Sequence, residues 1–390
     1  MKRGQSGLSF VVGINKPLGL TSHDVVGRVR KIFSERRVGH TGTLDPLASG
    51  VLAVCVGPAT RLVNYLQALD KQYIFKVVFG TATNTGDAAG TVSQKGEVPQ
   101  RVFDPQFAAE FVAGLVGKHQ QVPPAYSAIK VDGETSYQAA RAGKIIEHQP
   151  RPIEIYEACL LSIEDTDGSS PAWEVSVRVS KGTYIRVLAE DMGKALGCPS
   201  HVGKLERTRQ GILSLGECVS LEQLEVSKTE AILDPVKLLG FPLLEVETSI
   251  IPDIKNGKPL PWILHFVQDD TPNDGAPPCH SEAQSKNPQT VPWILHFVQD
   301  DTPNDSAPPC YDGAPSCHSE RSAKRAVEES ISSTHKPSNH SQPKPTEVDF
   351  LHNEFVSVVT DRVLLAIYQY DKTNELFKPS CVFAEGVMRG

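Results

Sequence analysis

The residues with the clearest chemical potential in this 390-residue chain lie within residues 38–52, V-G-H-T-G-T-L-D-P-L-A-S-G-V-L. Here one carboxylate, Asp45, stands between a Gly/Thr-rich turn and an apolar run that is typical of a buried strand. Asp before Pro is also a common turn starter, because the Asp side chain caps nearby backbone and Pro fixes φ. The position predicts an acid held at the edge of a core, where it could act as a nucleophile.

Three distant segments supply groups that such an acid would need. In residues 70–87 a β-rich run starting at Tyr73 leads into a Gly/Thr/Asn turn, which predicts a strand and a loop. In residues 174–196 alternating valines are followed by a turn and a helical apolar repeat, which places Arg186 in the first helical turn beside a strand end. Residues 201–211, H-V-G-K-L-E-R-T-R-Q-G, predict a basic loop with one apolar member, Leu205.

The elements around these segments predict an α+β fold. Helices are expected at residues 22–33, 104–116, 134–142 and 184–196, and from residue 220 onward. Strands alternate with them irregularly, a pattern typical of a mostly antiparallel mixed sheet with flanking helices.

Six motifs, in order, resemble the TruB family, the bacterial tRNA pseudouridine synthases that modify uridine 55 in the TΨC arm. They are K-P-L-G-L-T-S at 16–22, G-H-T-G-T-L-D-P-L-A-S-G at 39–50, the Tyr73 strand with F-G-T-A-T-N-T-G-D to residue 87, Q-V-P-P-A-Y-S-A-I-K-V-D-G at 121–133, S-K-G-T-Y-I-R at 180–186 and L-E-R-T-R-Q-G at 205–211. The resemblance spans nearly all of the first 215 residues. It implies the pseudouridine synthase fold, with an active cleft across its middle.

The chemistry of that family suits these residues. Pseudouridine forms when the bond from N1 to ribose breaks, the uracil turns and C5 rejoins the sugar, which is an isomerisation without net redox change. A carboxylate can hold a covalent adduct in glycosyl chemistry, so Asp45 is the candidate nucleophile. A carboxylate in a dry pocket stays ionised if an opposite charge lies within a few ångströms, and Arg186 is the expected partner. The alternative for Arg186 is an ordinary helix-surface arginine.

The resemblance also implies roles for residues that would handle an extruded base. Tyr73 would lie against the uracil, and whether it also removes the C5 proton stays open; a plain core aromatic is the alternative. His40 would fill the space left by the flipped base, or simply cap a turn. Tyr184 and Leu205 would form apolar walls, or belong to the core. Lys16 would contact a phosphate or the pocket edge, unless it is solvated surface.

The charge distribution is compatible with an RNA partner despite a net charge of −7. Residues 261–347 hold six basic and twelve acidic side chains, so the other 303 residues are nearly balanced, at 33 basic against 34 acidic. Two clusters of basic residues flank the Asp45 and Leu205 motifs, and we expect them to follow an RNA backbone. They are Arg28, Arg30, Lys31, Arg36 and Arg37 in the first cluster and Lys204, Arg207 and Arg209 in the second.

Residues 261–347 form the oddest part of the chain. Residues 261–279 return at 292–310 with one change, Gly275 to Ser306, and the segment is rich in Pro, Ser and Asp without a periodic core. We interpret it as an inserted, mostly disordered segment. Residues 245–260, with a continuation that resumes at Glu354, resemble the PUA module, a small RNA-binding β-barrel, and the inserted segment would split that module. The expected domains are therefore 1–240, the catalytic domain with a thumb-like insertion at about 104–143, and 241–390, the PUA-like module.

The sequence shows no P-loop, dinucleotide-binding or zinc-protease motif, so we expect neither cofactor nor metal. Cys279-His280, Cys310 and Cys317-His318 fit no common zinc spacing and recur through the repeat alone. We expect a cytoplasmic monomer that binds the TΨC stem-loop of tRNA, with no membrane association and no obligatory protein partner. Two alternatives remain: an RNA-binding or tRNA-folding protein with secondary catalysis, and a guide-RNA-dependent pseudouridine synthase.

Overall fold

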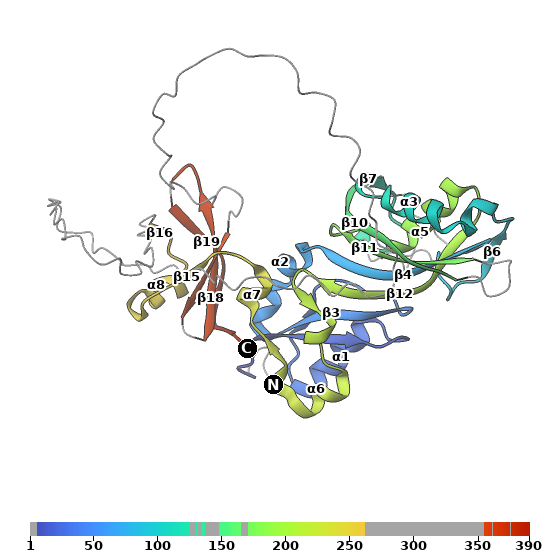
Figure 1. The fold of residues 1–390 in the computed structure, drawn as a ribbon. Helices are drawn as coiled ribbons and strands as arrows, with labels where there is room; N and C mark the ends of the chain where they lie inside the picture. Colours follow the sequence, from blue (N-terminus) through green and yellow to red (C-terminus); the bar gives the residue numbers. More distant parts are fainter. Residues whose placement is uncertain are drawn as a thin grey trace, which may run out of the picture.

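The computed structural model describes residues 6–124, 130–131, 134–136, 148–164, 171–261, 355–360, 362–374 and 376–390. Two sheets of unequal size dominate this part of the chain (Figure 1). The expectation of a disordered insert concerns residues that, from 262 onward, lie outside the described ranges. Part of the expected thumb-like insertion, at residues 125–129, 132–133 and 137–143, lies outside them too.

The larger sheet has ten strands in the order β14-β1-β3-β12-β4-β11-β10-β7, with β2 paired to β3 and β13 to β12. The strands are β1 (Phe10–Lys16), β2 (Val38–His40), β3 (Ala48–Val56), β4 (Lys71–Phe79), β7 (Gly117–Gln121), β10 (Arg151–Glu164), β11 (Ala172–Val179), β12 (Ser200–Gln210), β13 (Leu213–Ser214) and β14 (Ile232–Leu233). Neighbours are antiparallel except that β12 runs parallel to β3. The predicted α+β class with a mostly antiparallel mixed sheet is confirmed.

Several of the helices are bounded by residues with cap geometry. The helices are α1 (Ser22–Phe33), α2 (Val63–Ala68), α3 (Pro105–Ala113), α5 (Ile185–Leu196), α6 (Leu221–Ser227), α7 (Pro235–Leu239) and α8 (Ile251–Lys255), with short 3₁₀ turns η1 (Gly57–Leu62), η2 (Gln100–Phe103), η3 (Leu215–Glu217), η4 (Lys228–Ala231) and η5 (Thr248–Ile250). Thr21 and Asp24 form a capping box at the start of α1, and Gly197, at φ 83°, ends α5 in the left-handed conformation.

Two of the helix predictions need correction. The helix expected at 104–116 ends at Ala113, because Gly114 caps it before β7 begins at Gly117. In the stretch expected as a helix at 134–142, Glu134–Thr135 is a strand, β9, paired with β8 (Lys130–Val131), and residues 137–142 lie outside the described ranges. The pairing of these two-residue strands satisfies backbone N–H and C=O groups. The helical pattern of the local sequence did not reveal it. A second small hairpin pairs β5 (Thr81–Thr83) with β6 (Val92–Lys95).

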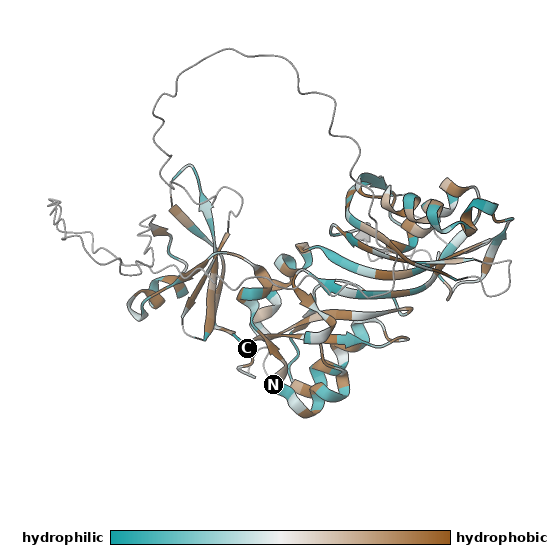
Figure 2. Ribbon diagram, viewed as in Figure 1, coloured by the Kyte–Doolittle hydropathy of each residue, from teal (hydrophilic) through white to brown (hydrophobic). Residues whose placement is uncertain are grey.

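Alternate residues of the large sheet feed two separate cores. Val12 and Ile14 of β1 face a core shared with α1, α5 and α6, whereas Val11 of β1 and Val51 of β3 face a core shared with α2, α7 and the second sheet. Figure 1 shows α3 and α5 over one end of the sheet and α1 and α6 near the other. Figure 2 shows apolar residues concentrated along the strands. The period-two pattern therefore fixes both faces of the central strands.

Residues 201–211 were expected to be a basic loop, and this prediction is wrong. They lie in β12, a central strand that pairs with β4 along most of its length and with β3 at Leu205–Arg207. Two register shifts along the β4 pairing disturb the alternation of side chains, and two of the buried positions, Arg207 and Gln210, are polar. A strand whose buried face is partly polar shows no clear hydrophobic period.

The second sheet is built by the chain after Leu243. Its five strands follow the order β15-β17-β18-β19-β16 and comprise β15 (Leu243–Glu245), β16 (Leu260–Pro261), β17 (Phe355–Thr360), β18 (Val363–Asp371) and β19 (Leu376–Met388). A core of its own, centred on Tyr368, Val358 and Ile254, lies inside this module. The sequence similarity to the two halves of a β-rich module thus corresponds to one sheet assembled from both sides of residues 262–354.

The second sheet packs against the larger sheet through α2 and α7. The guanidinium of Arg61 donates to the carbonyl of Val382 at 2.6 Å, and the hydroxyls of Tyr65 and Ser380 lie 2.8 Å apart. Arg389, next to the C-terminus, forms an ion pair with Asp234 at 2.9 Å. Contacts of this kind, together with a shared apolar core, hold the two modules in one arrangement.

Candidate active site

Asp45 lies in the loop of residues 41–47 that joins β2 to β3. The backbone of this loop is fastened on several sides. Leu44 donates its N–H to Ser22 Oγ at 2.8 Å, and the carbonyls of Asp45 and Pro46 accept from Ala48 N at 3.0 Å and Gly19 N at 2.8 Å. A carboxylate on so constrained a loop has a defined direction.

Arg186 meets Asp45 as the sequence predicted. It is the second residue of α5, which begins just after the turn from β11, and its Nε lies 2.9 Å from Asp45 Oδ2. The Arg186 side chain is 7% exposed and that of Asp45 is 34% exposed. The guanidinium is thus part of the protein interior, while the carboxylate remains open to a ligand. The helix-surface alternative for Arg186 is wrong.

The electrostatics of Asp45 reflect a competition between burial and nearby cations. Burial raises the pKa of the Asp45 carboxyl above its usual range, Arg186 and Lys16 act in the opposite direction, and Asp87 adds to the rise. A carboxylate with weakened solvation and one fixed partner is a better nucleophile than a fully hydrated one.

Asp87 is a site residue that the sequence did not single out. Its Oδ2 lies 3.9 Å from Arg186 Nε, and its Oδ1 accepts from Thr85 Oγ1 at 2.7 Å and Ala89 N at 3.1 Å. Arg186 also donates to the carbonyl of Thr85 at 2.9 Å. The loop of residues 84–89 therefore packs against the guanidinium from one side. The motif F-G-T-A-T-N-T-G-D contained the signal, because Asp87 is the only ionisable residue in it.

Comparison with known proteins assigns the chain to a family. Residues 30–185 match the N-terminal domain of the TruB family pseudouridylate synthases, and residues 186–239 match the tRNA pseudouridylate synthase B C-terminal domain. The chain belongs to the TruB family. Both Asp45 and Arg186 fall within these matches, Arg186 at the first residue of the second.

Curated TruB relatives are similar over most of their length. The tRNA pseudouridine synthase B of Bacillus cytotoxicus is 40% identical over 269 residues, which cover 67% of this chain and 86% of the relative. The enzyme of the same name from Deinococcus radiodurans is 38% identical, over 64% of this chain and 88% of the relative. Among solved structures, a Cbf5-Nop10-Gar1 complex is 26% identical, with a TM-score of 0.47, over 65% of this chain and 68% of that chain.

Tyr73 and Leu205, the expected stacking and wall residues, lie on adjacent strands of the larger sheet. Tyr73 of β4 stands opposite Arg207 of β12, and Leu205 of β12 stands next to Ala48 of β3, three residues after Asp45. Tyr73 and Leu205 are 8% and 6% exposed and belong to one apolar cluster, which also includes Leu44 of the Asp45 loop. The strands next to the Asp45 loop therefore carry the expected stacking residue, Tyr73, and the expected wall residue, Leu205.

Tyr184 is half-buried and is the N-cap residue of α5, two positions before Arg186. Its backbone N–H donates to Gln121 Oε1 at 2.8 Å and its carbonyl accepts from Gln121 Nε2 at 3.1 Å. Gln121 opens the family motif at residues 121–133, of which residues 125–129 and 132–133 lie outside the described ranges. This pair of bonds fixes the entry into α5 and hence the direction of Arg186.

His40 and Lys16 complete the candidate set. His40, at the end of β2, is half-buried, and burial and the charge of Arg207 lower its pKa, which favours a neutral ring. Lys16 is fully buried, so the solvated-surface alternative is wrong. Its ammonium donates to the carbonyls of Pro17 at 2.9 Å and Leu20 at 2.7 Å, and burial lowers its pKa to about 8. Lys16 thus acts on Asp45 as a second cation inside the protein.

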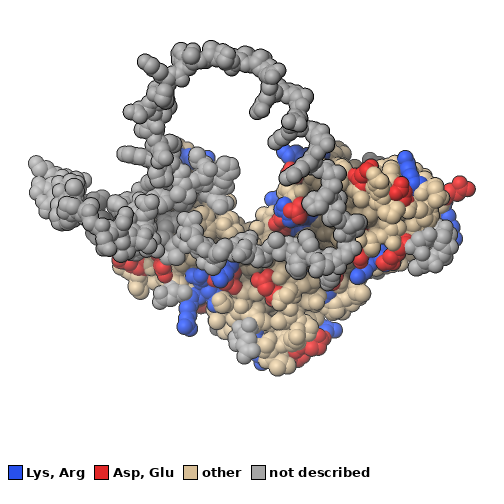
Figure 3. Space-filling view, in the orientation of Figure 1, with Lys and Arg blue, Asp and Glu red and all other residues tan. Residues whose placement is uncertain are grey.

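The expected basic surface is less uniform than the sequence suggested. Arg28, Lys31, Arg36 and Arg37 are exposed, as are Lys204 and Arg209, but Arg207 is buried. On the face seen in Figure 3, basic and acidic side chains are interspersed.

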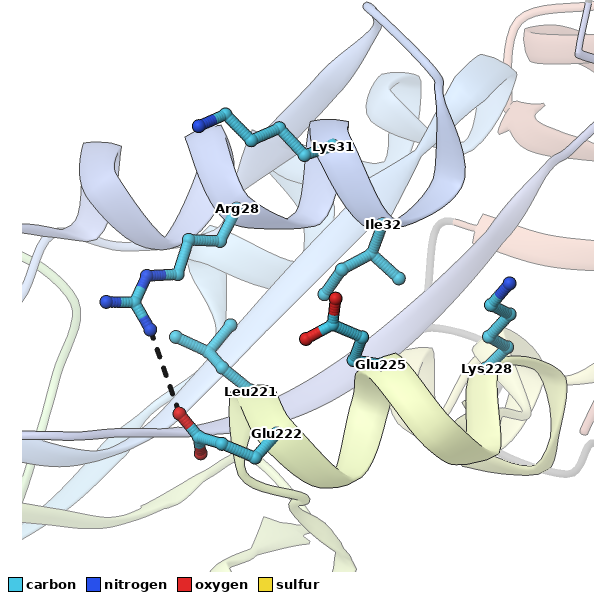
Figure 4. Close-up of a pocket in the computed structure, with 7 residues that line it drawn as sticks. All are labelled: Arg28, Lys31, Ile32, Leu221, Glu222, Glu225 and Lys228. Atoms are coloured by element: carbon cyan, nitrogen blue, oxygen red, sulfur yellow. Dashed lines mark ion pairs between the residues drawn. The ribbon is translucent and has the colours of Figure 1, made fainter.

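A mixed-charge pocket lies between α1 and α6. It has a volume of about 420 Å³, and in it Arg28 faces Glu222 at 3.7 Å (Figure 4). The lining also includes Lys31, Ile32, Leu221, Glu225 and Lys228. The acidic residues of α6 thus offset part of the basic α1 surface, and none of the lining residues belongs to the candidate catalytic set.

Further observations concern metals and membranes. Among the described residues, no group of three or more His, Cys, Asp or Glu side chains is arranged to hold a metal ion. The histidine–cysteine pairs at 279–280, 310 and 317–318 fall outside the described ranges. No helix in the described part of the chain is long and apolar enough to cross a membrane.

Proposed function

We propose that this chain is a tRNA pseudouridine synthase that isomerises uridine 55 in the TΨC loop. The observation that carries the proposal is the ion pair of Asp45 and Arg186 at 2.9 Å, set in the two matched domains of the TruB family. The curated relatives named tRNA pseudouridine synthase B support tRNA as the substrate class. A cytoplasmic location is part of the same proposal, and tRNA as the substrate class supports it.

The proposed reaction uses the free oxygen of the Asp45 carboxylate. Arg186 holds Oδ2, and Oδ1 attacks C1′ of the target uridine as the bond from C1′ to N1 breaks. The released uracil anion turns in the pocket, and C5 then attacks C1′ and displaces the carboxylate. C5 loses one proton and N1 gains one, so the product is an isomer of the substrate. The reaction consumes no cofactor.

The surrounding residues act on the base and not on the bond. A loop uridine must leave its stack before C1′ is accessible, and extrusion costs a few kcal/mol. His40 at the rim would fill the vacated space, since its lowered pKa favours a neutral ring that can stack. Tyr73 and Leu205 are both buried in one apolar cluster. In this proposal they contact the uracil while it turns.

The C-terminal sheet supplies a second RNA-binding surface in this proposal. We assign residues 1–240 to catalysis and residues 241–390 to a PUA-like module, with the low-complexity segment from residue 261 inserted between β16 and β17. The contacts of Arg61 and Tyr65 with β19 hold the two parts of the protein in a fixed relative position. A tRNA could then contact both surfaces without a domain rearrangement, and no protein partner is required.

Incubating the purified full-length protein with an unmodified tRNA transcript tests the proposal. We expect pseudouridine at the single TΨC-loop uridine in the absence of guide RNA, and none with Asp45→Asn or with a transcript that carries cytidine at this position. Product that appears only after a guide RNA is added would favour a guided synthase. Accelerated tRNA folding without any product would favour the RNA-folding alternative.

A further inference from the structure

Arg207 is a buried guanidinium without a carboxylate partner. Its residue exposure is 1%, and no Asp or Glu oxygen among the described residues lies within 4 Å of it. Its Nε donates to the carbonyl of Val51 at 2.6 Å and its Nη2 approaches the carbonyl of Gly42 at 3.4 Å. Burying a charge without a counter-charge is costly, so a residue with this placement needs a reason.

The position of Arg207 in the sheet suggests that reason. On β12 it stands between Gly50 of β3 and Tyr73 of β4. A Cβ on Gly50 would lie 2.2 Å from the carbonyl oxygen of Arg207, so the two backbones are in the closest contact that glycine allows. From this fixed point the side chain reaches the first residues of the loop that carries Asp45.

Gln210, three residues further along β12, holds the neighbouring residue of the same loop. Its Nε2 donates to Thr41 Oγ1 at 2.7 Å and to the carbonyl of Leu66 at 2.9 Å. Gln210 is 2% exposed, and its Oε1 is buried without a hydrogen-bond partner in the described part of the chain. The Gln210 amide nitrogen thus supplies hydrogen bonds to the loop and to α2, while the amide oxygen lacks a partner in the described part of the chain.

Together these contacts fasten the catalytic loop at its start. Gln210 holds Thr41, Arg207 reaches Gly42, and Ser22 of α1 holds Leu44 through its N–H at 2.8 Å. We propose that Arg207 and Gln210 are positioning residues that fix residues 41–44 and thereby aim the Asp45 carboxylate at its target. This role replaces the RNA contact expected for Arg207 from the sequence, and it rests on the proposed function.

The proposal predicts a loss of catalysis without a loss of binding. A misplacement of about 1 Å costs about 10²-fold in rate. We therefore expect Arg207→Lys, which keeps the charge but not the planar fork, to lower the single-turnover rate about 10-fold to 100-fold. The dissociation constant for tRNA and its salt dependence should stay at the wild-type values. Weaker binding with a salt slope reduced by about one would instead identify an RNA contact and overturn the proposal.

Amide hydrogen exchange in the free protein provides a readout independent of activity. We expect faster exchange in residues 41–45 of Arg207→Lys, with the exchange of β4 and β11 unchanged. If wild type makes no pseudouridine, the proposed function fails, yet this exchange result still decides whether Arg207 holds the loop. Unchanged exchange in residues 41–45 would overturn the positioning role.

Matched variants protect the test against general unfolding. Thr41→Val removes the hydroxyl that Gln210 holds, whereas Thr41→Ser keeps it, so only the valine variant should loosen the loop and slow the reaction. These two variants decide the question if Arg207→Lys fails to fold. Arg101→Lys serves as the control, because exposed Arg101 also donates to a carbonyl, that of Leu196 at 2.9 Å, but far along the chain from the loop. It should show wild-type rate and exchange.

Discussion

Asp87 lies 3.9 Å from the Arg186 nitrogen that pairs with Asp45 at 2.9 Å. One buried guanidinium therefore serves two carboxylates of different function. Asp45 is open to a ligand, whereas Asp87 is 9% exposed in its side chain and tied to its own loop by Thr85 and Ala89. Asp87 thus orients Arg186, and it also adds negative charge beside Asp45, the proposed nucleophile.

Asp87→Asn should lower the reaction rate and shift the acidic limb of the pH–rate profile. Without the charge of Asp87, Arg186 loses one of the two carboxylates that orient it. We expect the maximal single-turnover rate to fall about 10-fold to 100-fold. Because Asp87 raises the pKa of Asp45, its removal should move the acidic limb of the rate profile to lower pH. A rate profile that falls in height without moving would show that the two carboxylates do not interact.

Arg186→Lys should move the same limb the other way. Arg186 lowers the pKa of Asp45 through its charge and its hydrogen bond, and lysine cannot reproduce the planar donor geometry. We expect a rate about 10²-fold lower and an acidic limb at higher pH than in wild type. The measurement is single-turnover pseudouridine formation across pH. An unshifted limb would mean that the ion pair does not control the ionisation of Asp45.

Asp45→Asn should not cost stability at neutral pH. A carboxyl whose pKa is higher in the folded than in the unfolded chain holds its proton more tightly when folded, so its ionisation destabilises the fold. This penalty is absent below the unfolded pKa and is complete above the folded pKa. The melting temperature of the variant relative to wild type should therefore rise as the pH increases from about 4, the pKa of an unfolded Asp, through the higher pKa of the folded state. A falling difference would contradict the raised pKa.

Gly50 and Gly27 make a stability pair. Gly50 has φ 105°, and an added Cβ would lie 2.2 Å from the Arg207 carbonyl, so Gly50→Ala should destabilise the protein by about 3 kcal/mol or more and separate β3 from β12. Gly27 lies inside α1, and a Cβ added there would have no atom within 4 Å. Gly27→Ala should therefore stabilise the protein by about 0.5–1 kcal/mol. Urea unfolding of both variants measures the contrast.

The sequence predicts those parts of the fold that depend on local chemistry. The capping box at Thr21 and Asp24, the Asp104 cap with Pro105 and the Gly197 stop all lie at helix ends, because capping needs only neighbouring residues. The pairing of Asp45 and Arg186 was also predictable, since a nucleophilic carboxylate in a family of known chemistry needs a cation.

What the sequence did not predict depends on tertiary contact. The strand β12 was missed because Arg207 and Gln210 occupy buried positions whose polarity is compensated by tertiary hydrogen bonds to β3, α2 and the loop of residues 41–42. Asp87 was missed because its proximity to Arg186 brings together a loop and a helix that are nearly one hundred residues apart in the sequence. Buried polar residues that bind another loop give no periodic signal, so they are the positions that a structure adds.

Removing residues 262–347 should leave the fold and the catalysis intact. In the C-terminal sheet, β16 and β17 are separated by β19 and β18, three strand spacings that amount to about 14–15 Å. The seven residues 348–354 that would remain between Pro261 and Phe355 can span about 23–25 Å, enough to cross the sheet. Shortening the connection should also stabilise the module by about 2 kcal/mol, since each halving of a loop is worth about 0.6 kcal/mol. We expect a higher melting temperature, an unchanged single-turnover rate and a tRNA dissociation constant equal to or below that of the full chain. A tRNA affinity that falls on deletion, with the rate at saturating tRNA preserved, would show instead that this segment takes part in RNA binding.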